Sequence, residues 1–174
     1  MGGVSKPAAR LAGRRLIDYP LSVLCEVCDR VAVVCKRDTL LERLPDAVER
    51  WNEPDDPRHP AAGIAHALEV AGAPVLVCAA DMPFVSAEAG HRLVEAAGAA
   101  PDSRAVVAEA AGWLQPTFAV YRPAALPALR ASGDAQLIRV VERLDPVLVD
   151  MPPRQMRSVD TPDALAAAER ELTA

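Results

Sequence analysis

The chain has 174 residues, of which 51% are hydrophobic and 25% charged, and its formal net charge is -5. This length suits one domain, and we expect residues 1–174 to form a single domain. The acidic balance excludes a general nucleic-acid coat, and no uncharged apolar run reaches the roughly 18 residues of a membrane span. The first residues lack the apolar core of a secretory signal. We therefore expect a cytoplasmic protein that contacts neither nucleic acid nor membrane.

Strands and helices alternate in the apolar pattern. Apolar runs rich in β-branched residues predict strands over 31–35, 74–79, 105–108, 117–121 and 147–150. Their apolar pattern is continuous, as in sheets that are covered on both faces. Helices are expected over 16–28, 39–44, 61–71, 87–97, 123–131 and 135–144, and a last helix opens at Thr161 and Pro162. The alternation predicts an α/β fold, a three-layer α/β/α sandwich with a mostly parallel, mixed, Rossmann-like sheet.

The chain opens with two glycines and a nearby lysine: Gly2, Gly3 and Lys6. Glycines let the backbone approach a phosphate closely, and a lysine neutralises its charge. Taken alone, this segment is more often a flexible start than a phosphate loop. Lysine is rare in the chain: of the 19 Lys and Arg residues, only Lys6 and Lys36 are lysines.

Cys25 and Cys28 have the CxxC spacing that is found in zinc and redox sites. No second CxxC follows, and the histidines are scattered. We interpret the two residues as core cysteines on one buried helix face, in a reducing compartment. A zinc or redox module is the least favoured alternative.

A loop rich in proline and charge spans residues 52–60, before a helix that carries Gly63 in its first turn. Loops of this kind lie at the carboxyl ends of parallel strands, where ligands bind. The unpaired backbone N–H groups of a first helical turn can meet an anion or a base edge, and Arg58 and His59 are close to them in sequence. The alternative is a solvated acidic loop with a proline-fixed helix start.

Two carboxylates stand at the ends of predicted elements. Asp81 follows the strand over 74–79, and Asp160 precedes the last helix. Mg²⁺ bound to phosphates needs one or two such carboxylates. The alternative interpretations are a turn cap for Asp81 and an acid favoured by the helix dipole for Asp160.

Taken in order, these segments resemble the molybdenum cofactor guanylyltransferases and the wider nucleotidyltransferase group. Residues 1–7 (MGGVSKP) are similar to the end of a glycine-rich loop of the form LAGGxSxRMGGxDKP. The further matching segments are 11–17 (LAGRRLI), 59–64 (HPAAGI), 80–84 (ADMPF), 115–121 (QPTFAVY) and 159–165 (VDTPDAL). Together they extend over essentially the whole chain.

The resemblance implies GMP transfer from GTP to a phosphorylated pterin, with release of pyrophosphate and with Mg²⁺ as cofactor. It implies that Lys6 contacts the triphosphate, that Asp81 holds Mg²⁺ and that Asp160 lies at a second position beside the metal. Gly2, Gly3 and Gly63 would line the nucleotide, with Glu53 or the adjacent Asn52 near the base. Either Arg58 or Arg154 would add positive charge. A homo-oligomer is compatible with the sequence.

Two departures from the family pattern matter. The opening strand and the first half of the glycine-rich loop are missing, so we expect that the chain starts at an internal methionine and that the native protein is longer. The short form would then be weakly active or inactive. HPAAGI replaces the family's GPLAGI, and Ser5 replaces an acidic residue. The alternatives are therefore cytidylyl or other nucleotidyl transfer to a different phosphorylated acceptor, or an inactive nucleotide-binding remnant.

Overall fold

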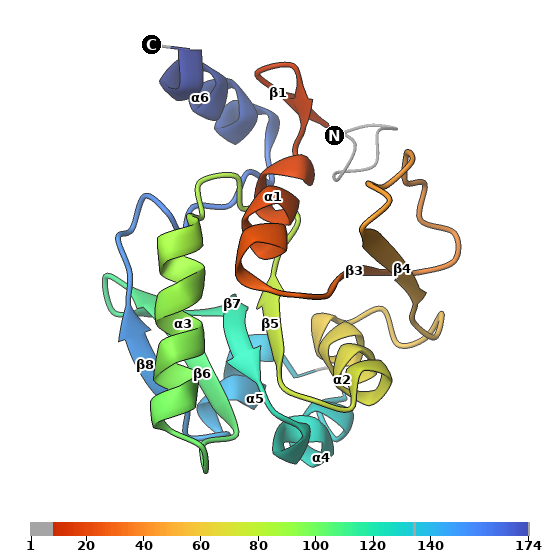
Figure 1. The fold of residues 1–174 in the computed structure, drawn as a ribbon, viewed down its shortest axis with the longest axis vertical. Helices are drawn as coiled ribbons and strands as arrows, with labels where there is room; N and C mark the ends of the chain where they lie inside the picture. Colours follow the sequence, from red (N-terminus) through yellow and green to blue (C-terminus); the bar gives the residue numbers. More distant parts are fainter. Residues whose placement is uncertain (1–8, 134, 174) are drawn as a thin grey trace.

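The computed structural model describes residues 9–133 and 135–173 (Figure 1). The strands are β1 (Arg10–Leu11), β2 (Arg14–Arg15), β3 (Val31–Cys35), β4 (Val48–Asn52), β5 (Val75–Cys78), β6 (Ala105–Ala110), β7 (Trp113–Tyr121) and β8 (Val147–Asp150). The helices are α1 (Asp18–Val27), α2 (Pro60–Ala71), α3 (Ala87–Ala99), the 3-10 turn η2 (Pro123–Ala125), α4 (Leu126–Arg130), α5 (Leu137–Glu142) and α6 (Pro162–Thr173).

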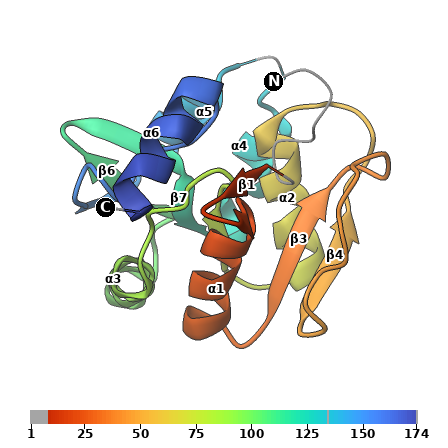
Figure 2. The same cartoon turned by 90° about the horizontal axis from the view of Figure 1, so that it is seen from above.

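The main sheet has four strands in the order β5-β7-β6-β8. Strand β7 pairs antiparallel with β5 and β6, and β8 pairs parallel with β6. Three of its strands therefore run in one direction and β7 runs in the other, which confirms the mixed sheet that the sequence predicts. Strands β3 and β4 form a separate parallel pair beside α2, and β1 and β2 form a short hairpin (Figure 2).

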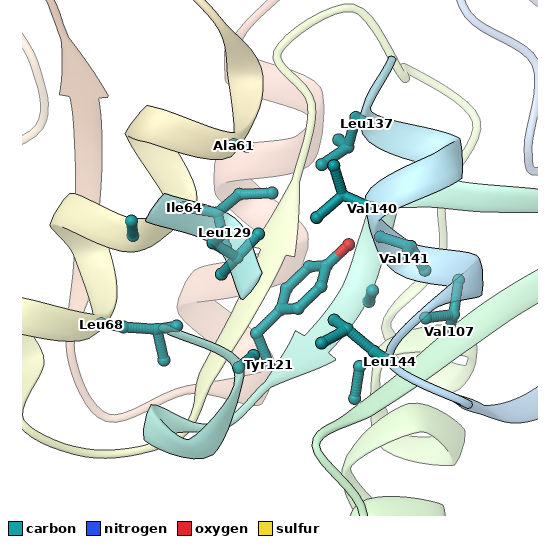
Figure 3. Close-up of a cluster of buried hydrophobic side chains, with 14 residues drawn as sticks. Ala61, Ile64, Leu68, Val107, Tyr121, Leu129, Leu137, Val140, Val141 and Leu144 are labelled. Atoms are coloured by element: carbon teal, nitrogen blue, oxygen red, sulfur yellow. The ribbon is translucent and has the colours of Figure 1, made fainter. Parts of the chain in front are cut away.

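Helices cover both faces of the main sheet. On one face, α3 buries Leu93 against Val106 and Phe118. On the other face, α2, α4 and α5 pack around Tyr121, and Ile64 is one of the side chains that surround it (Figure 3). Alternate residues of β6 and β7 thus point into two different cores. This arrangement confirms the three-layer sandwich.

The segment 39–44 is not a helix, contrary to the prediction, and no regular element is present there. It forms part of the connection between the parallel strands β3 and β4. Six residues are too few to hold a helix without packing along one face. Leu40 is 81% exposed, whereas Leu41 and Leu44 pack against the α1–β3–β4 core. Leu41 and Leu44 therefore anchor the β3–β4 connection to this core.

Strand β4 was not predicted, because its sequence VERWN breaks the apolar pattern with two charged residues. Glu49 and Arg50 are exposed, as expected for a strand at the edge of a sheet. The predicted helix 123–131 is divided into η2 and α4, and β7 begins four residues earlier than expected.

Cys25 and Cys28 were expected to share one buried helix face, and they do not. Cys28 is half-buried, but Cys25 is exposed, so the two residues do not share a buried face. Both are free thiols, and the described residues contain no group of three or more His, Cys, Asp or Glu side chains able to hold a metal ion. Among the helices described, none is long and apolar enough to cross a membrane.

Candidate functional site

The site is built at the carboxyl ends of β3 and β4. In this parallel pair Cys35 lies opposite Asn52, so the next residues, Lys36 and Glu53, leave the ladder together. The Glu53 backbone N–H donates to the Cys35 carbonyl at 3.0 Å, which extends the pairing by one residue. The strand register therefore brings a lysine and a glutamate to the same edge.

The Glu53 side chain lies against the first turn of α2. A Cβ atom at Gly63 would come within 3.2 Å of Glu53 Oε2, so the carboxylate occupies the space that a larger residue would fill. The helix begins after His59, whose Nδ1 accepts from the Ala61 backbone N–H at 3.1 Å. Glu53 and Gly63, both predicted to bind nucleotide, are thus brought together.

Asn52 has a different environment from Glu53. It is exposed, and its Oδ1 accepts from Arg50 Nε at 3.1 Å. Of the two alternatives, Glu53 and not Asn52 lies against Gly63. The structure therefore favours Glu53 as the side chain that faces the first turn of α2.

Asp81 and Asp160 come from distant parts of the chain and lie on adjacent segments. The Val159 backbone N–H donates to the Asp81 carbonyl at 2.7 Å. Asp81 follows β5 and is half-buried, whereas Asp160 is exposed. Thr161 Oγ1 accepts from the Ala164 N–H at 3.1 Å, so the predicted cap of α6 is present. This cap holds Asp160 at the start of the helix.

The Asp81 carboxylate influences its surroundings. Burial raises the pKa of the Cys78 thiol to about 12, and the negative charge of Asp81 acts in the same direction. Cys78 therefore stays protonated at neutral pH, and we assign it no chemical role.

The donor set at Asp81 and Asp160 fits a hard divalent cation. Both side chains offer carboxylate oxygens, and neither thiol nor imidazole is required. Mg²⁺ prefers such oxygens and fills its other positions with water and substrate phosphates. Two protein carboxylates are therefore compatible with Mg²⁺ bound together with a nucleotide.

Arg58 is engaged at the rim of the site. Arg58 Nη2 lies 2.6 Å from Asp38 Oδ2, and this ion pair is more than 60% exposed on both sides. The guanidinium holds the pKa of Asp38 below its usual value. An exposed pair of this kind contributes little to stability.

Arg154 and Arg157 approach Phe84, which follows Asp81 in the chain. Their guanidinium carbons lie 5.6 and 4.4 Å from the Phe84 ring centroid. Both also pair with Glu171 of α6 and lower the pKa of its carboxyl. The two arginines thus connect the Asp81 segment to the C-terminal helix.

Gly2, Gly3 and Lys6 lie outside the described residues. Lys36 was not predicted as a site residue, although its side chain is buried beside Glu53. Its rarity in an arginine-rich chain was the only signal in the sequence.

The comparisons with known proteins agree with the observed fold. The fold is that of solved nucleotidyltransferases. A structure of molybdopterin-guanine dinucleotide biosynthesis protein A from Archaeoglobus fulgidus matches with a TM-score of 0.77 and 25% identity, covering 99% of this chain and 95% of that one. A 2-C-methyl-D-erythritol 4-phosphate cytidylyltransferase from Thermus thermophilus matches with a TM-score of 0.73, over 97% and 94% of the two chains, and its 20% identity supports the fold alone.

The chain belongs to the MobA-like NTP transferase domain family, whose model matches residues 1–147. A probable molybdenum cofactor guanylyltransferase from Natronomonas pharaonis is 34% identical, over 99% of this chain and 92% of that protein. The resemblance noted in the sequence is therefore confirmed.

Proposed function

We propose that the protein transfers GMP from GTP to the terminal phosphate of a pterin cofactor and releases pyrophosphate. Family membership and the similarity to a guanylyltransferase over nearly the whole chain support this reaction. The observation that carries it is the contact between the Asp81 and Val159 backbones. This contact keeps the chain segments that carry Asp81 and Asp160 side by side, which supports the proposal that both carboxylates act on one metal ion.

Glu53 is proposed to select the base. Guanine presents two neighbouring donors on its Watson–Crick edge, the N1–H and the 2-amino group. An ionised carboxylate only accepts hydrogen bonds, so it suits donors of this kind. Cytosine presents one amino donor beside an acceptor nitrogen, which a carboxylate would repel. The position of Glu53 against Gly63 supports a guanine site at the start of α2.

Asp81 and Asp160 are proposed to hold Mg²⁺. When bound, Mg²⁺ supplies charge neutralisation and a template for phosphate oxygens. Lys6 is proposed to contact the triphosphate as a point charge, with Gly2 and Gly3 offering backbone N–H groups. Arg58 and Arg154 are candidates for further phosphate contacts.

The chemistry needs no general base. The acceptor phosphate is already an anion at neutral pH, and its oxygen forms a bond to the α-phosphorus of GTP. The bond from that phosphorus to the bridging oxygen breaks, and pyrophosphate leaves with the electron pair. The barrier comes from repulsion between anions and from alignment. The protein therefore contributes positioning and positive charge.

GTP and a phosphorylated pterin are the proposed partners. Free cysteines would persist in a reducing compartment, so we place the reaction in the cytoplasm.

The test is pyrophosphate release from GTP with Mg²⁺ and the pterin acceptor. We expect Asp81→Asn to lower turnover by at least about 100-fold, since it removes a carboxylate charge that would hold Mg²⁺ at the phosphates. Asp102→Asn is the matched control, because Asp102 is an exposed turn residue before β6, and it should keep full activity. Near-normal turnover in Asp81→Asn would contradict the assignment.

A further inference from the structure

Lys36 is the one charged residue that is buried among the residues the structure describes. Its side chain is 9% exposed and that of its partner Glu53 is 12% exposed. A lysine is almost never buried unless its charge is compensated. The position immediately after β3 therefore has a specific requirement for a cation.

The Lys36 ammonium group faces three oxygen atoms. It donates to the Pro54 carbonyl at 2.5 Å and to the Pro57 carbonyl at 2.9 Å, and it lies 3.5 Å from Glu53 Oε2. An ammonium group has three protons and accepts nothing, so the two carbonyls take two of them and the Glu53 carboxylate supplies the opposite charge at ion-pair distance. One side chain thus fixes the loop after Glu53 at two backbone points and faces the Glu53 carboxylate.

Glu53 depends on this cation. Its Oε2 atom is inaccessible to solvent and has no hydrogen-bond partner, and it lies against the Gly63 position. A buried carboxylate that loses its counter-charge is strongly destabilised. Among the described residues, Lys36 is the only cation that forms an ion pair with Glu53.

We propose that Lys36 is a positioning residue for base selection. It holds the Glu53 carboxylate oriented toward the first turn of α2, and it does not touch the nucleotide. The proposal rests on the proposed function, in which the Glu53 carboxylate accepts from the donor groups of guanine. It predicts that loss of Lys36 reduces discrimination between bases rather than binding of the phosphates.

The test compares GTP with ITP, whose base lacks the 2-amino group, by calorimetric titration in the presence of Mg²⁺. Lys36→Met should weaken GTP binding about tenfold or more and bring the GTP/ITP affinity ratio close to one. ITP binding should change less, because ITP offers Glu53 one donor fewer. Arg37→Met removes a neighbouring exposed cation and should leave the ratio unchanged.

A double variant separates positioning from general stability. In a Glu53→Gln background the carboxylate charge is absent, so adding Lys36→Met should not change the GTP/ITP ratio further. Replacing both partners of a buried pair is also tolerated better than breaking it, which keeps the double variant folded if Lys36→Met alone unfolds. A further fall in the ratio in the double variant would overturn the proposal.

The outcomes distinguish this proposal from the proposed function. If the wild-type protein does not prefer GTP to ITP, the assignment of Glu53 fails and the role of Lys36 fails with it. If the wild type prefers GTP and Lys36→Met keeps that preference, only the role of Lys36 fails. The same holds if Lys36→Met weakens GTP and ITP equally.

Discussion

Gly63 shows how a single missing side chain shapes the site. The Glu53 carboxylate lies where a Cβ of residue 63 would approach, with Oε2 at 3.2 Å and Cδ at 3.7 Å. Glycine normally weakens a helix interior by about 0.5–1 kcal/mol relative to alanine. Its presence in α2 is therefore explained by the space that Glu53 needs.

Gly63→Ala should separate stability from binding. We expect little net change in stability, because the helix propensity of alanine offsets the cost of moving the buried Glu53 carboxylate, and GTP binding weakened about tenfold because Glu53 must shift. Thermal unfolding and calorimetric titration measure the two effects. Gly98→Ala is the matched control in α3, where nothing lies within 4 Å of the new Cβ, so it should change stability alone. Equal GTP affinities in the two variants would contradict the role of Gly63.

At the residue scale the sequence offers some of the candidate site residues. Gly63, Asp81 and Asp160 lie in local motifs that resemble a family, and Glu53 was one of two alternatives, with Asn52, near the base. Lys36 could not be predicted, because its partners depend on the register of β3 against β4. Its contacts to Pro54 and Pro57 also depend on how the following loop folds back.

The start of α1 shows how an ion pair joins two elements. Arg15, in β2, contacts both carboxylate oxygens of Asp18, the first residue of α1, and the shortest distance is 2.6 Å. The side chains are only 14% and 26% exposed. Arg15 also donates to the Arg43 carbonyl at 2.9 Å, so the pair fixes the hairpin, α1 and the β3–β4 connection together.

The Asp18 pair should appear in the pH dependence of stability. Hydrogen bonds from Arg15 lower the pKa of Asp18 in the folded protein below its ordinary value of 3.8. The stabilisation is therefore fully present above that value and is lost as the pH falls through the lower, folded-state pKa. Asp18→Asn should destabilise the protein by up to about 1 kcal/mol at pH 7, with a difference that disappears in acid.

Unfolding midpoints measured from neutral to acidic pH test this expectation. Asp46→Asn is the control, because Asp46 forms an i,i+3 pair with Arg43 whose side chains are more than 80% exposed. We expect Asp46→Asn to leave the midpoints unchanged throughout. A destabilisation by Asp18→Asn that persists undiminished at low pH would contradict the account.

Strands were predicted best where the apolar run is unbroken. Strand β3, whose two end residues are buried and whose middle residues are half-buried, was predicted with its correct ends. Segment 39–44 was predicted wrongly as a helix, since its leucine spacing imitates a helical face while tertiary contacts use the residues separately. Strand β4 was missed because the charged residues Glu49 and Arg50 interrupt its apolar pattern.

The whole molecule assembles its candidate site from three separate regions. The β3–β4 pair supplies Glu53, the end of β5 supplies Asp81, and the segment before α6 supplies Asp160. Ala80 packs against the α1–β3–β4 core, and Val159 donates to the Asp81 carbonyl. The three-layer fold was predictable from the alternation of elements. The contact between the Asp81 and Val159 segments was implied only by the family resemblance, because tertiary topology creates it.

The most direct measurement is a calorimetric titration of GTP and of CTP, each with Mg²⁺, into the wild-type protein and into Glu53→Gln. The account predicts that the wild type binds GTP at least about tenfold more tightly than CTP, and that Glu53→Gln removes this preference. Tighter binding of CTP would indicate cytidylyl transfer at the same site. Binding of neither nucleotide, or a preference for GTP that survives Glu53→Gln, would contradict the central claim that this carboxylate selects guanine for nucleotidyl transfer.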